Sequence, residues 1–391
     1  MSNKENMSQI DLLHVKEFDE KPTLIISVPG VYTLLGEFAD FCSGYTLYGG
    51  SGKSLDGTYS LRKDQTVRIF LATHGERKRI NLLNIKYRKE DRWANYIKGV
   101  VAAFNTRGYH PTGCNITLNG ELLSEETETL RAAIALNVAL GFNEFNNFNL
   151  TKEECANIAY TALSQFVSEP SRLTRFLAML FVKNDYYLYF DVLHMSYTSI
   201  PVEQKGKIVF LTIESNISPL AFKEEITLRR EECKEAFDRF LPFMPTRIIR
   251  DITEDEVKEI KSGLSEDDKR LISYVLSESR ITKEAVNLLE QNEMVLYGRA
   301  LTRIQVGLRD VFEISCPEID WLTKRSGETL KSYGSAMIGG GSSGTIIILI
   351  DREAISTYTS RMEEYEHIFG FKPVIKEFHP SGELKIDTIH V

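Results

Sequence analysis

Short segments of alternating apolar and polar residues, rich in β-branched side chains, predict strands along the whole chain. These segments are 23–27, 66–72, 115–118, 186–191, 207–213, 345–351 and 374–378. Between them, apolar residues recur at the spacing of one helical face. The segments that predict helices are 93–106, 129–141, 152–165, 225–240, 253–263, 267–291, 294–314 and 352–369.

Both halves of the chain mix strand and helix, which predicts an α+β fold. At 391 residues the chain is too long for one ordinary core, so we expect two packed domains. The chain becomes mostly helical after residue 215, and the junction is placed near residue 205. The predicted domains are therefore 1–205 and 206–391.

Charge and cysteine usage narrow the functional classes. A net charge of −8 argues against a nucleic-acid binder, and the basic run 76–80 is better explained as a solvated loop. No stretch reaches about 18 apolar residues, and the N-terminus lacks the apolar core of a signal peptide, so no membrane association is expected. Five widely spaced cysteines without a CxxC motif indicate free thiols in a reducing compartment. We therefore predict a cytoplasmic protein.

One glycine-rich stretch, 50–54 with the sequence GSGKS, resembles part of a phosphate-binding P-loop. A P-loop needs another glycine five residues before Gly52, and that position holds Leu47. The stretch is therefore predicted to be a glycine-rich hairpin or loop. The seven scattered histidines and the cysteine spacing predict no metal site.

A set of longer motifs points to a known family. Residues 28–41, VPGVYTLLGEFADF, resemble the galactokinase signature APGRVNLIGEHTDY. Four further segments are similar to galactokinase motifs and follow the family's order: RWANYIKGV (92–100), LRREECKEA (228–236), LRDVFEISCPEID (308–320) and GSAMIGGGSSGTIII (334–348). The chain thus resembles a galactokinase over nearly its whole length.

The resemblance implies the GHMP small-molecule kinase fold, with two α+β domains and the active-site cleft between them. In that family the ATP phosphates lie on a serine-rich loop at a helix N-terminus, where free N–H groups and the helix dipole favour anions. An aspartate takes or holds the proton of the sugar hydroxyl, and an arginine stabilises the transferring charge.

Both catalytic positions differ in this chain. The family arginine corresponds to Val31, which has neither charge nor donor. The stretch 166–176, FVSEPSRLTRF, matches the family's FVGMPCGIMDQ and places Arg175 at the aspartate. An arginine stays protonated and cannot act as a base. No catalytic residue of the family is therefore intact.

The phosphate loop is also altered, because the matching stretch carries Ser124, Glu125, Glu126, Thr127 and Glu128. A carboxylate ~4 Å from a phosphate charge costs about 4 kcal/mol at an effective dielectric constant of about 20. We expect these glutamates to pair with Arg172 and Arg175. Ordinary capping of the helix by Ser124 with Thr127 or Glu128 is compatible with that pairing.

The sugar side is partly retained. Glu37 and Asp40 match the family's sugar-contacting carboxylates, and Gly44 matches a small residue beside the sugar. Phe38 replaces a family histidine, and Ile226 replaces a family tyrosine. The two carboxylates could equally satisfy nearby backbone donors. The third motif, with Gly339, Gly340 and Gly341, is best preserved, and a tight entry into a strand explains its small residues.

These observations predict a galactokinase-like pseudokinase that lacks phosphotransferase activity and needs no cofactor. It would sense a sugar, such as a hexose, or a protein partner. The alternative is an active sugar-1-kinase that uses ATP and Mg²⁺ in a rearranged site. A further possibility is a different enzyme that acts on an anionic sugar attracted by Arg172 and Arg175.

Overall fold

The computed structural model describes residues 8–124, 127–202, 206–218, 220–339 and 344–388. The chain divides into two compact units that are not continuous in sequence. Unit 1 comprises Met1–Val31, Gly50–Asn184 and Ser381–Val391, and unit 2 comprises Tyr32–Gly49 and Asp185–Pro380. This division differs from the predicted domains 1–205 and 206–391, because strands β1 and β2 each contribute residues to both units.

Unit 1 is built on a mixed sheet with the strand order β12-β1-β2-β5-β3-β4. The strand bounds are β1 Leu24–Leu35, β2 Tyr45–Leu61, β3 Thr66–Leu71, β4 Glu76–Asn81, β5 Cys114–Asn119 and β12 Lys385–Thr388. The pair β3–β5 is parallel, whereas β1–β12, β2–β5 and β3–β4 are antiparallel.

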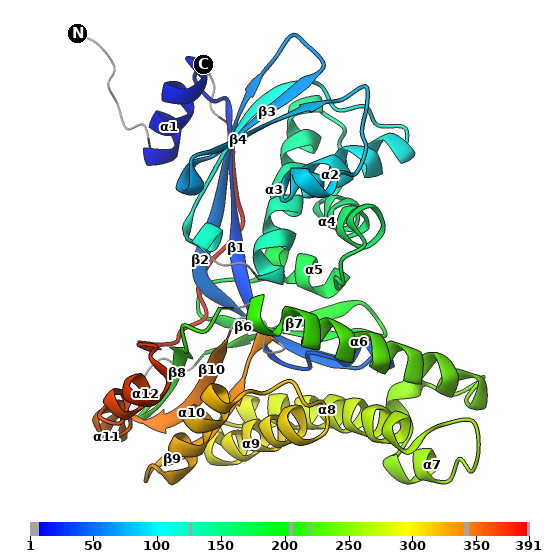
Figure 1. Ribbon diagram of the computed structural model, residues 1–391, viewed down its shortest axis with the longest axis vertical. Helices are drawn as coiled ribbons and strands as arrows, with labels where there is room; N and C mark the ends of the chain where they lie inside the picture. Colours follow the sequence, from blue (N-terminus) through cyan, green and yellow to red (C-terminus); the bar gives the residue numbers. More distant parts are fainter. Residues whose placement is uncertain (1–7, 125–126, 203–205, 219, 340–343, 389–391) are drawn as a thin grey trace. The chain divides into compact units, whose positions relative to one another are not determined.

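The helices of unit 1 cover this sheet, with α2 to α5 grouped on one side and α1 on the other (Figure 1). Their bounds are α1 Gln9–Phe18, α2 Ala94–Thr106, α3 Glu128–Asn146, α4 Lys152–Thr161 and α5 Leu173–Phe181. Shorter turns are η2 Ala72–His74, η3 Lys89–Asp91, η4 Glu121–Ser124 and the π-helical turn η5 Ala162–Val167. Helix α3 is buried continuously from Ala132 to Asn143, as expected for a helix at the centre of a layer.

Helix α1 is fixed to the sheet by a buried histidine. His14 Nδ1 lies 3.0 Å from Thr117 Oγ1 and 3.1 Å from Thr58 Oγ1, and Nε2 lies 3.0 Å from Ser60 Oγ. Burial disfavours the charged imidazolium and lowers the pKa of His14 from about 6.5 to about 4. The histidine is therefore neutral at pH 7.

Unit 2 contains an antiparallel sheet with the order β11-β8-β10-β9. Its strands are β8 Ile208–Glu214, β9 Ser332–Met337, β10 Thr345–Asp351 and β11 Val374–Glu377. Every residue of β10 is buried, which explains its uninterrupted run of isoleucines and leucine. A hairpin of β6 Tyr186–Asp191 and β7 Ser196–Pro201 pairs with the start of β2.

Helices and short turns supply the rest of unit 2. They are η1 Ala39–Cys42, α6 Leu220–Phe240, η6 Leu241–Phe243, η7 Ile249–Asp251, α7 Glu254–Lys258, α8 Glu266–Glu290, α9 Met294–Asp310, α10 Pro317–Glu328, η9 Arg352–Ala354, α11 Ile355–Thr359 and α12 Met362–Phe369. The core of this unit joins α6, α8 and α9 to the buried sides of β8 to β10.

The predicted α+β class is confirmed, and most periodic segments lie in the expected elements. The predicted strands 66–72, 186–191, 207–213 and 345–351 are β3, β6, β8 and β10, and the long predicted helices 267–291 and 294–314 are α8 and α9. The expected helix 352–369 is broken into η9, α11 and α12, and helix α10 was not predicted.

The glycine-rich stretch 50–54 was wrongly predicted as a hairpin or loop, because it lies inside β2. Its glycines allow a close approach of the chain near Ser381. A Cβ atom at Gly50 would lie 2.3 Å from the carbonyl oxygen of Ser381, and Gly52, at φ +76°, donates its N–H to that oxygen. A strand with this packing cannot form the phosphate cradle of a P-loop.

The basic run 76–80 was also wrongly predicted as a loop, since it forms the edge strand β4. Arg77 donates two hydrogen bonds to Glu17, at 2.6 and 2.7 Å. Charged side chains are common on edge strands, where they discourage pairing with another chain. The run therefore needs no nucleic-acid partner to explain it.

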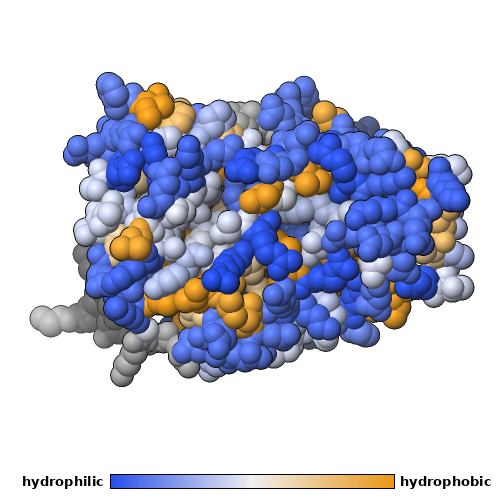
Figure 2. Space-filling model, turned by 90° about the horizontal axis from the view of Figure 1, so that it is seen from below, coloured by the Kyte–Doolittle hydropathy of each residue, from blue (hydrophilic) through white to orange (hydrophobic). Residues whose placement is uncertain are grey.

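Three further observations concern the cysteines, the helices and the surface of the described residues. All five cysteines are buried and unbridged. No helix in the described ranges is both long and apolar enough to span a membrane. On the face seen in Figure 2, hydrophilic side chains dominate, and the apolar side chains form several separate groups.

Candidate functional site

Of the predicted phosphate-loop residues, Thr127 and Glu128 lie at the start of α3 in unit 1. Thr127 is the N-cap, and its side chain accepts a hydrogen bond from the N–H of Leu130 at 3.3 Å. Glu128 is the first helical residue, where the positive end of the helix dipole favours a carboxylate. Capping by Thr127 is thus present. Ser124 ends η4, while Glu125 and Glu126 lie outside the described residues.

Arg175 of α5 links this helix start to strand β1. Its Nη2 atom lies 3.1 Å from Oε2 of Glu128, and Nη1 donates to Oγ1 of Thr129 at 3.0 Å. The Thr129 hydroxyl in turn donates to the carbonyl oxygen of Val31 at 3.3 Å. The structure therefore brings Val31, Glu128 and Arg175 together, and it confirms the expected ion pair between the acidic stretch and Arg175.

A second ion pair lies on the next turn of α3. Nε of Arg131 is 2.6 Å from Oε2 of Glu169. Glu169 follows the π-helical turn η5 and Ser168, which has a left-handed backbone at φ +60°. Arg172, at the start of α5, is also buried. Each glutamate of this cluster that the structure describes thus has an arginine partner.

The chemistry open to this cluster follows from the burial of Arg175, whose side chain is 4% exposed. A guanidinium stays protonated in proteins, so Arg175 can donate hydrogen bonds but cannot accept a proton. Its burial is tolerated because the carboxylate of Glu128 balances its charge and the hydroxyl of Thr129 accepts a hydrogen bond from Nη1. The cluster can hold charge, and its most buried member cannot serve as a general base.

In unit 2 the predicted sugar carboxylate Glu37 follows β1 and is buried. The backbone N–H groups of Glu37 and Phe38 donate to Oε1 and Oε2 of Glu278, at 3.2 and 3.1 Å. Glu278 lies in α8 and is 1% exposed. A buried carboxylate on a distant helix therefore fixes the backbone that carries Glu37.

Asp40 is held by a side chain from α6. Its Oδ2 atom accepts a hydrogen bond from Nη2 of Arg230 at 3.0 Å. The guanidinium of Arg230 also lies over the rings of Phe38 and Phe41, 5.2 and 5.1 Å from their centroids. Asp40 thus pairs with a fixed cation and keeps an exposed edge, because a third of its side chain is accessible.

Two positions at which the resemblance implies polar sugar contacts lie in the apolar core. Phe38 is fully buried and stacks on Phe312, with ring centroids 3.9 Å apart. Ile226 of α6 is buried in the same core. The apolar residues at these positions therefore contribute to packing within unit 2.

Gly44 is required by close packing. A Cβ atom at this position would lie 2.3 Å from Oγ of Ser279 and 2.9 Å from Sγ of Cys42. The space beside Gly44 is thus occupied by α8, and a glycine is needed there whether or not a sugar binds nearby.

The third motif lies between β9 and β10. Gly339 and Gly344 both have left-handed backbones, at φ +64° and +59°, and Gly344 immediately precedes β10. The expected tight entry into a strand is present at Gly344. Gly340 and Gly341 lie outside the described residues.

Comparison with known proteins shows the family. No family model matches the chain. A galactokinase-like protein of Treponema pallidum (strain Nichols) is 32% identical over 387 residues, which cover 97% of this chain and 96% of the relative. The chain belongs to the galactokinase family. A galactokinase of Roseiflexus sp. (strain RS-1) is 26% identical over 347 residues, 88% of each chain.

Solved structures show the same fold. The crystal structure of Lactococcus lactis galactokinase complexed with galactose has a TM-score of 0.87 at 18% identity, covering 96% of this chain and 98% of that one. The Methanococcus jannaschii mevalonate kinase has a TM-score of 0.62 at 14% identity, covering 94% of this chain and 98% of that one. This galactokinase-family chain therefore has the GHMP kinase fold.

Several residues of the two sites were not predicted. Arg131, Glu169 and Thr129 were missed because their partners lie far away in sequence. Glu278 could have been noticed, because it occupies the apolar face of α8 between the buried residues Val275 and Ile281. A charged residue at such a position needs buried partners, which is a signal of a special role.

Proposed function

We propose that this galactokinase-family protein binds a sugar and does not phosphorylate it, so that it acts as a sensor of the sugar or of a protein partner. The ion pair between Arg175 and Glu128 carries this proposal. It combines a permanent cation at the position that matches the family's base with a carboxylate at the helix start that matches its phosphate loop.

Both residues oppose phosphotransfer for separate reasons. Without a general base the rate falls by roughly 10²–10⁴. A carboxylate at the start of α3 takes the place of a ligand anion at the helix N-terminus and repels phosphate. Val31 adds a third loss, because a buried valine cannot stabilise the transferring charge.

Sugar binding is supported by unit 2. The Lactococcus lactis galactokinase of the same fold was solved with galactose. Glu37 and Asp40 match the carboxylates that contact the sugar in the family, and Glu278 and Arg230 fix them in place. Binding without chemistry is what a sugar sensor requires, and a sugar-dependent surface could then be read by a protein partner.

Thermal unfolding with separate ligands tests the proposal. A ligand at about 100 times its Kd adds about 2.7 kcal/mol to the free energy of unfolding, so binding raises the Tm. We expect galactose or another hexose to raise the Tm and Mg-ATP to leave it unchanged. Glu37→Gln should remove the sugar effect, whereas Asp238→Asn, at an exposed ion pair with Lys234, should retain it.

The alternative is an ATP- and Mg²⁺-dependent sugar-1-kinase with a rearranged site, which the names of the relatives favour. Stabilisation by Mg-ATP together with formation of a sugar phosphate from any hexose would establish that activity. Stabilisation by sugar phosphates alone would instead indicate a different enzyme or a sensor of anionic sugars.

A further inference from the structure

Two exposed arginines lie side by side on the sheet of unit 1. Strands β3 and β4 pair so that Arg68 is directly opposite Arg79, and both residues are exposed. Residues at such positions share one face of a sheet, with Cβ atoms roughly 4.5–5.5 Å apart. This is the face that carries α1, because Asn115, the β5 neighbour of Arg68, bonds to Glu20 just after that helix. We call Arg68 and Arg79 the arginine pair.

The carboxylates around the arginine pair are engaged with other groups. Glu17 accepts two hydrogen bonds from Arg77, at 2.6 and 2.7 Å. Asp64 accepts two from Arg62, at 2.9 and 2.6 Å. Glu20 accepts hydrogen bonds from two neutral side chains, each at 2.9 Å. Within the described ranges, neither member of the arginine pair forms an ion pair.

The arginine pair has no evident role in the fold. Like charges at directly opposed positions destabilise a sheet. Protection of an edge strand explains charges on β4, but β3 lies inside the sheet between β4 and β5. A neutral or acidic residue in place of Arg68 would leave that protection intact and remove the repulsion. Residues that cost stability in this way are expected where a chain binds something.

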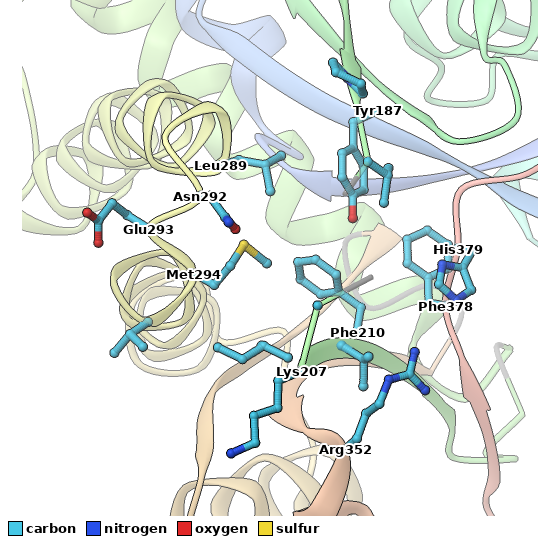
Figure 3. Close-up of a pocket in the computed structure, with 16 residues that line it drawn as sticks. Tyr187, Lys207, Phe210, Leu289, Asn292, Glu293, Met294, Arg352, Phe378 and His379 are labelled. Atoms are coloured by element: carbon cyan, nitrogen blue, oxygen red, sulfur yellow. The ribbon is translucent and has the colours of Figure 1, made fainter. Parts of the chain in front are cut away.

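The cations at the groove of unit 2 drawn in Figure 3 show the opposite situation. Lys207 lies 3.5 Å from Asp351 and 3.4 Å from Glu353. Arg352 donates two hydrogen bonds to Glu377, at 2.6 and 2.8 Å. Carboxylates of unit 2 therefore balance both cations, and the arginine pair is the better candidate for an anionic partner.

The neighbours of the arginine pair indicate the chemistry of that partner. Thr66 and Asn81, the next opposed residues on the same face, are polar. Phe70, on the other side of Arg68 along β3, is 9% exposed, and the guanidinium of Arg77 covers its ring at 4.7 Å. No open ring is thus available there for stacking by a nucleic-acid base. Each guanidinium can instead bind a carboxylate through two parallel hydrogen bonds.

We propose that the arginine pair docks an acidic segment of a partner protein, with one carboxylate on each guanidinium. This rests on the proposed function in one respect, because it names the surface that a protein partner would contact. The surface consists of residues of unit 1 alone. It uses none of the residues assigned to the sugar.

Fluorescence anisotropy with the full chain tests the docking, using two labelled peptides of eight residues. One peptide alternates glutamate and threonine, and the other has glutamine in place of every glutamate. We expect the acidic peptide to bind with a Kd on the order of 0.1–1 mM at low salt, as suits a few exposed ion pairs. The neutral peptide should bind about tenfold more weakly. Salt at about 200 mM should weaken only the acidic peptide.

Variants locate the binding. Arg68→Gln and Arg79→Gln should each weaken the acidic peptide about threefold and leave the neutral peptide unchanged. Arg68→Lys should weaken it less, because lysine keeps the charge and loses the planar fork. The matched control is Arg299→Gln, at an exposed arginine of α9 that forms no ion pair in the described part of the chain. It should change neither affinity.

The Tm of the free chain gives a second readout. Arg68→Gln and Arg79→Gln should each raise it by about 1–2 °C, because either change removes the repulsion. The double variant should gain little more than one of them, which is the signature of a coupled pair. Neither peptide nor sugar is needed here. A failure of hexoses to stabilise the chain would remove the sugar proposal and leave this one standing.

The proposal is overturned if the acidic peptide does not bind, or if both peptides bind equally. It is also overturned if Arg299→Gln weakens the acidic peptide as much as the changes at the arginine pair do. A lower Tm in either glutamine variant would show that the pair serves the fold. Tighter binding of an oligothymidine of similar length, lost in the same variants, would contradict a protein partner.

Discussion

Units 1 and 2 each bury charged residues at or beside positions that the resemblance matches to galactokinase motifs, and the charges are satisfied in different ways. In unit 1, Arg175 is neutralised by Glu128, a residue on another helix. In unit 2, the carboxylate of Glu278 is satisfied by two backbone N–H groups, and it supports Glu37. In unit 1 the two charges neutralise each other, whereas in unit 2 the buried carboxylate of Glu278 positions the backbone that carries Glu37.

The residues that differ from the family motifs also have different surroundings in the two units. In unit 1, Arg175 lies beside Glu128, a partner of opposite charge. In unit 2, Phe38 and Ile226 entered the apolar core. If the protein is inactive as proposed, unit 1 has lost its chemistry by pairing charges and unit 2 has lost polar contacts to the apolar core, and the fold is kept in both.

Charge reversal in unit 1 should have the largest effect on stability. Arg175→Asp places two carboxylates together in a buried site and should lower the free energy of unfolding by about 3–5 kcal/mol. Glu128→Arg should also destabilise, because it places two arginines together. The double reversal Glu128→Arg/Arg175→Asp should recover at least about 1 kcal/mol, measured by urea unfolding as a double-mutant cycle.

The matched control is the exposed pair of Lys234 and Asp238, 3.0 Å apart. Reversal of either charge there should change stability by less than about 1 kcal/mol. Additive effects of the two reversals at Glu128 and Arg175 would show that the ion pair contributes nothing.

Acid should destabilise unit 1 through His14, the one histidine that is buried in the described part of the chain. Its pKa is about 4 in the folded chain and near 6.5 when unfolded, so the unfolded chain binds more protons between these values. The contribution of neutral His14 to the free energy of unfolding should therefore be fully present above pH 6.5. It should fall by about 3 kcal/mol as the pH drops to 4.

Urea unfolding at several pH values measures this dependence. In His14→Gln the fall between pH 6.5 and 4 should shrink by that amount, although the variant is less stable at pH 7. His110→Gln, at an exposed histidine, should leave the slope as it is. An unchanged slope in His14→Gln would show that other groups cause the acid sensitivity.

Restoring the family histidine in unit 2 should cost stability without improving sugar binding. Phe38→His places a polar ring against Phe312 in the core, which should lower the free energy of unfolding by about 2 kcal/mol. The Tm increase caused by galactose, compared between variant and wild type, should not grow. A larger increase would mean that position 38 can reach the sugar.

The smallest effect is expected when the family's arginine and aspartate are introduced at positions 31 and 175 in unit 1. Val31→Arg/Arg175→Asp supplies the charge donor and the base, but the carboxylate of Glu128 remains at the helix start. We expect no sugar phosphate in an assay with Mg-ATP and galactose. Measurable product would show that the acidic stretch opposes phosphate binding less than its charge implies.

Much of the fold could be predicted because long elements carry a clear period. The helices α8 and α9 and the strand β10 bury one side or both, so the sequence shows their spacing directly. Strand β2 was missed over residues 50–54, since glycine has no side chain to alternate and the reason for it is the distant Ser381. Local pattern cannot show a partner that is hundreds of residues away.

The candidate sites, like the fold, could be predicted only in part from the sequence. Motif order alone placed Val31, Glu128 and Arg175 in one site, and the structure brings them together. It could not supply the connecting hydroxyl of Thr129 or the support that Glu278 gives to Glu37, because those contacts depend on how helices pack. Family resemblance predicts which positions meet, and packing decides what holds them.

Calorimetric titration of Mg-ATP into the sugar-saturated wild-type chain tests the central claim most directly. If Glu128 and Arg175 satisfy each other at the start of α3, no nucleotide binding should be detected up to millimolar Mg-ATP. Micromolar binding with turnover of the sugar would contradict this account.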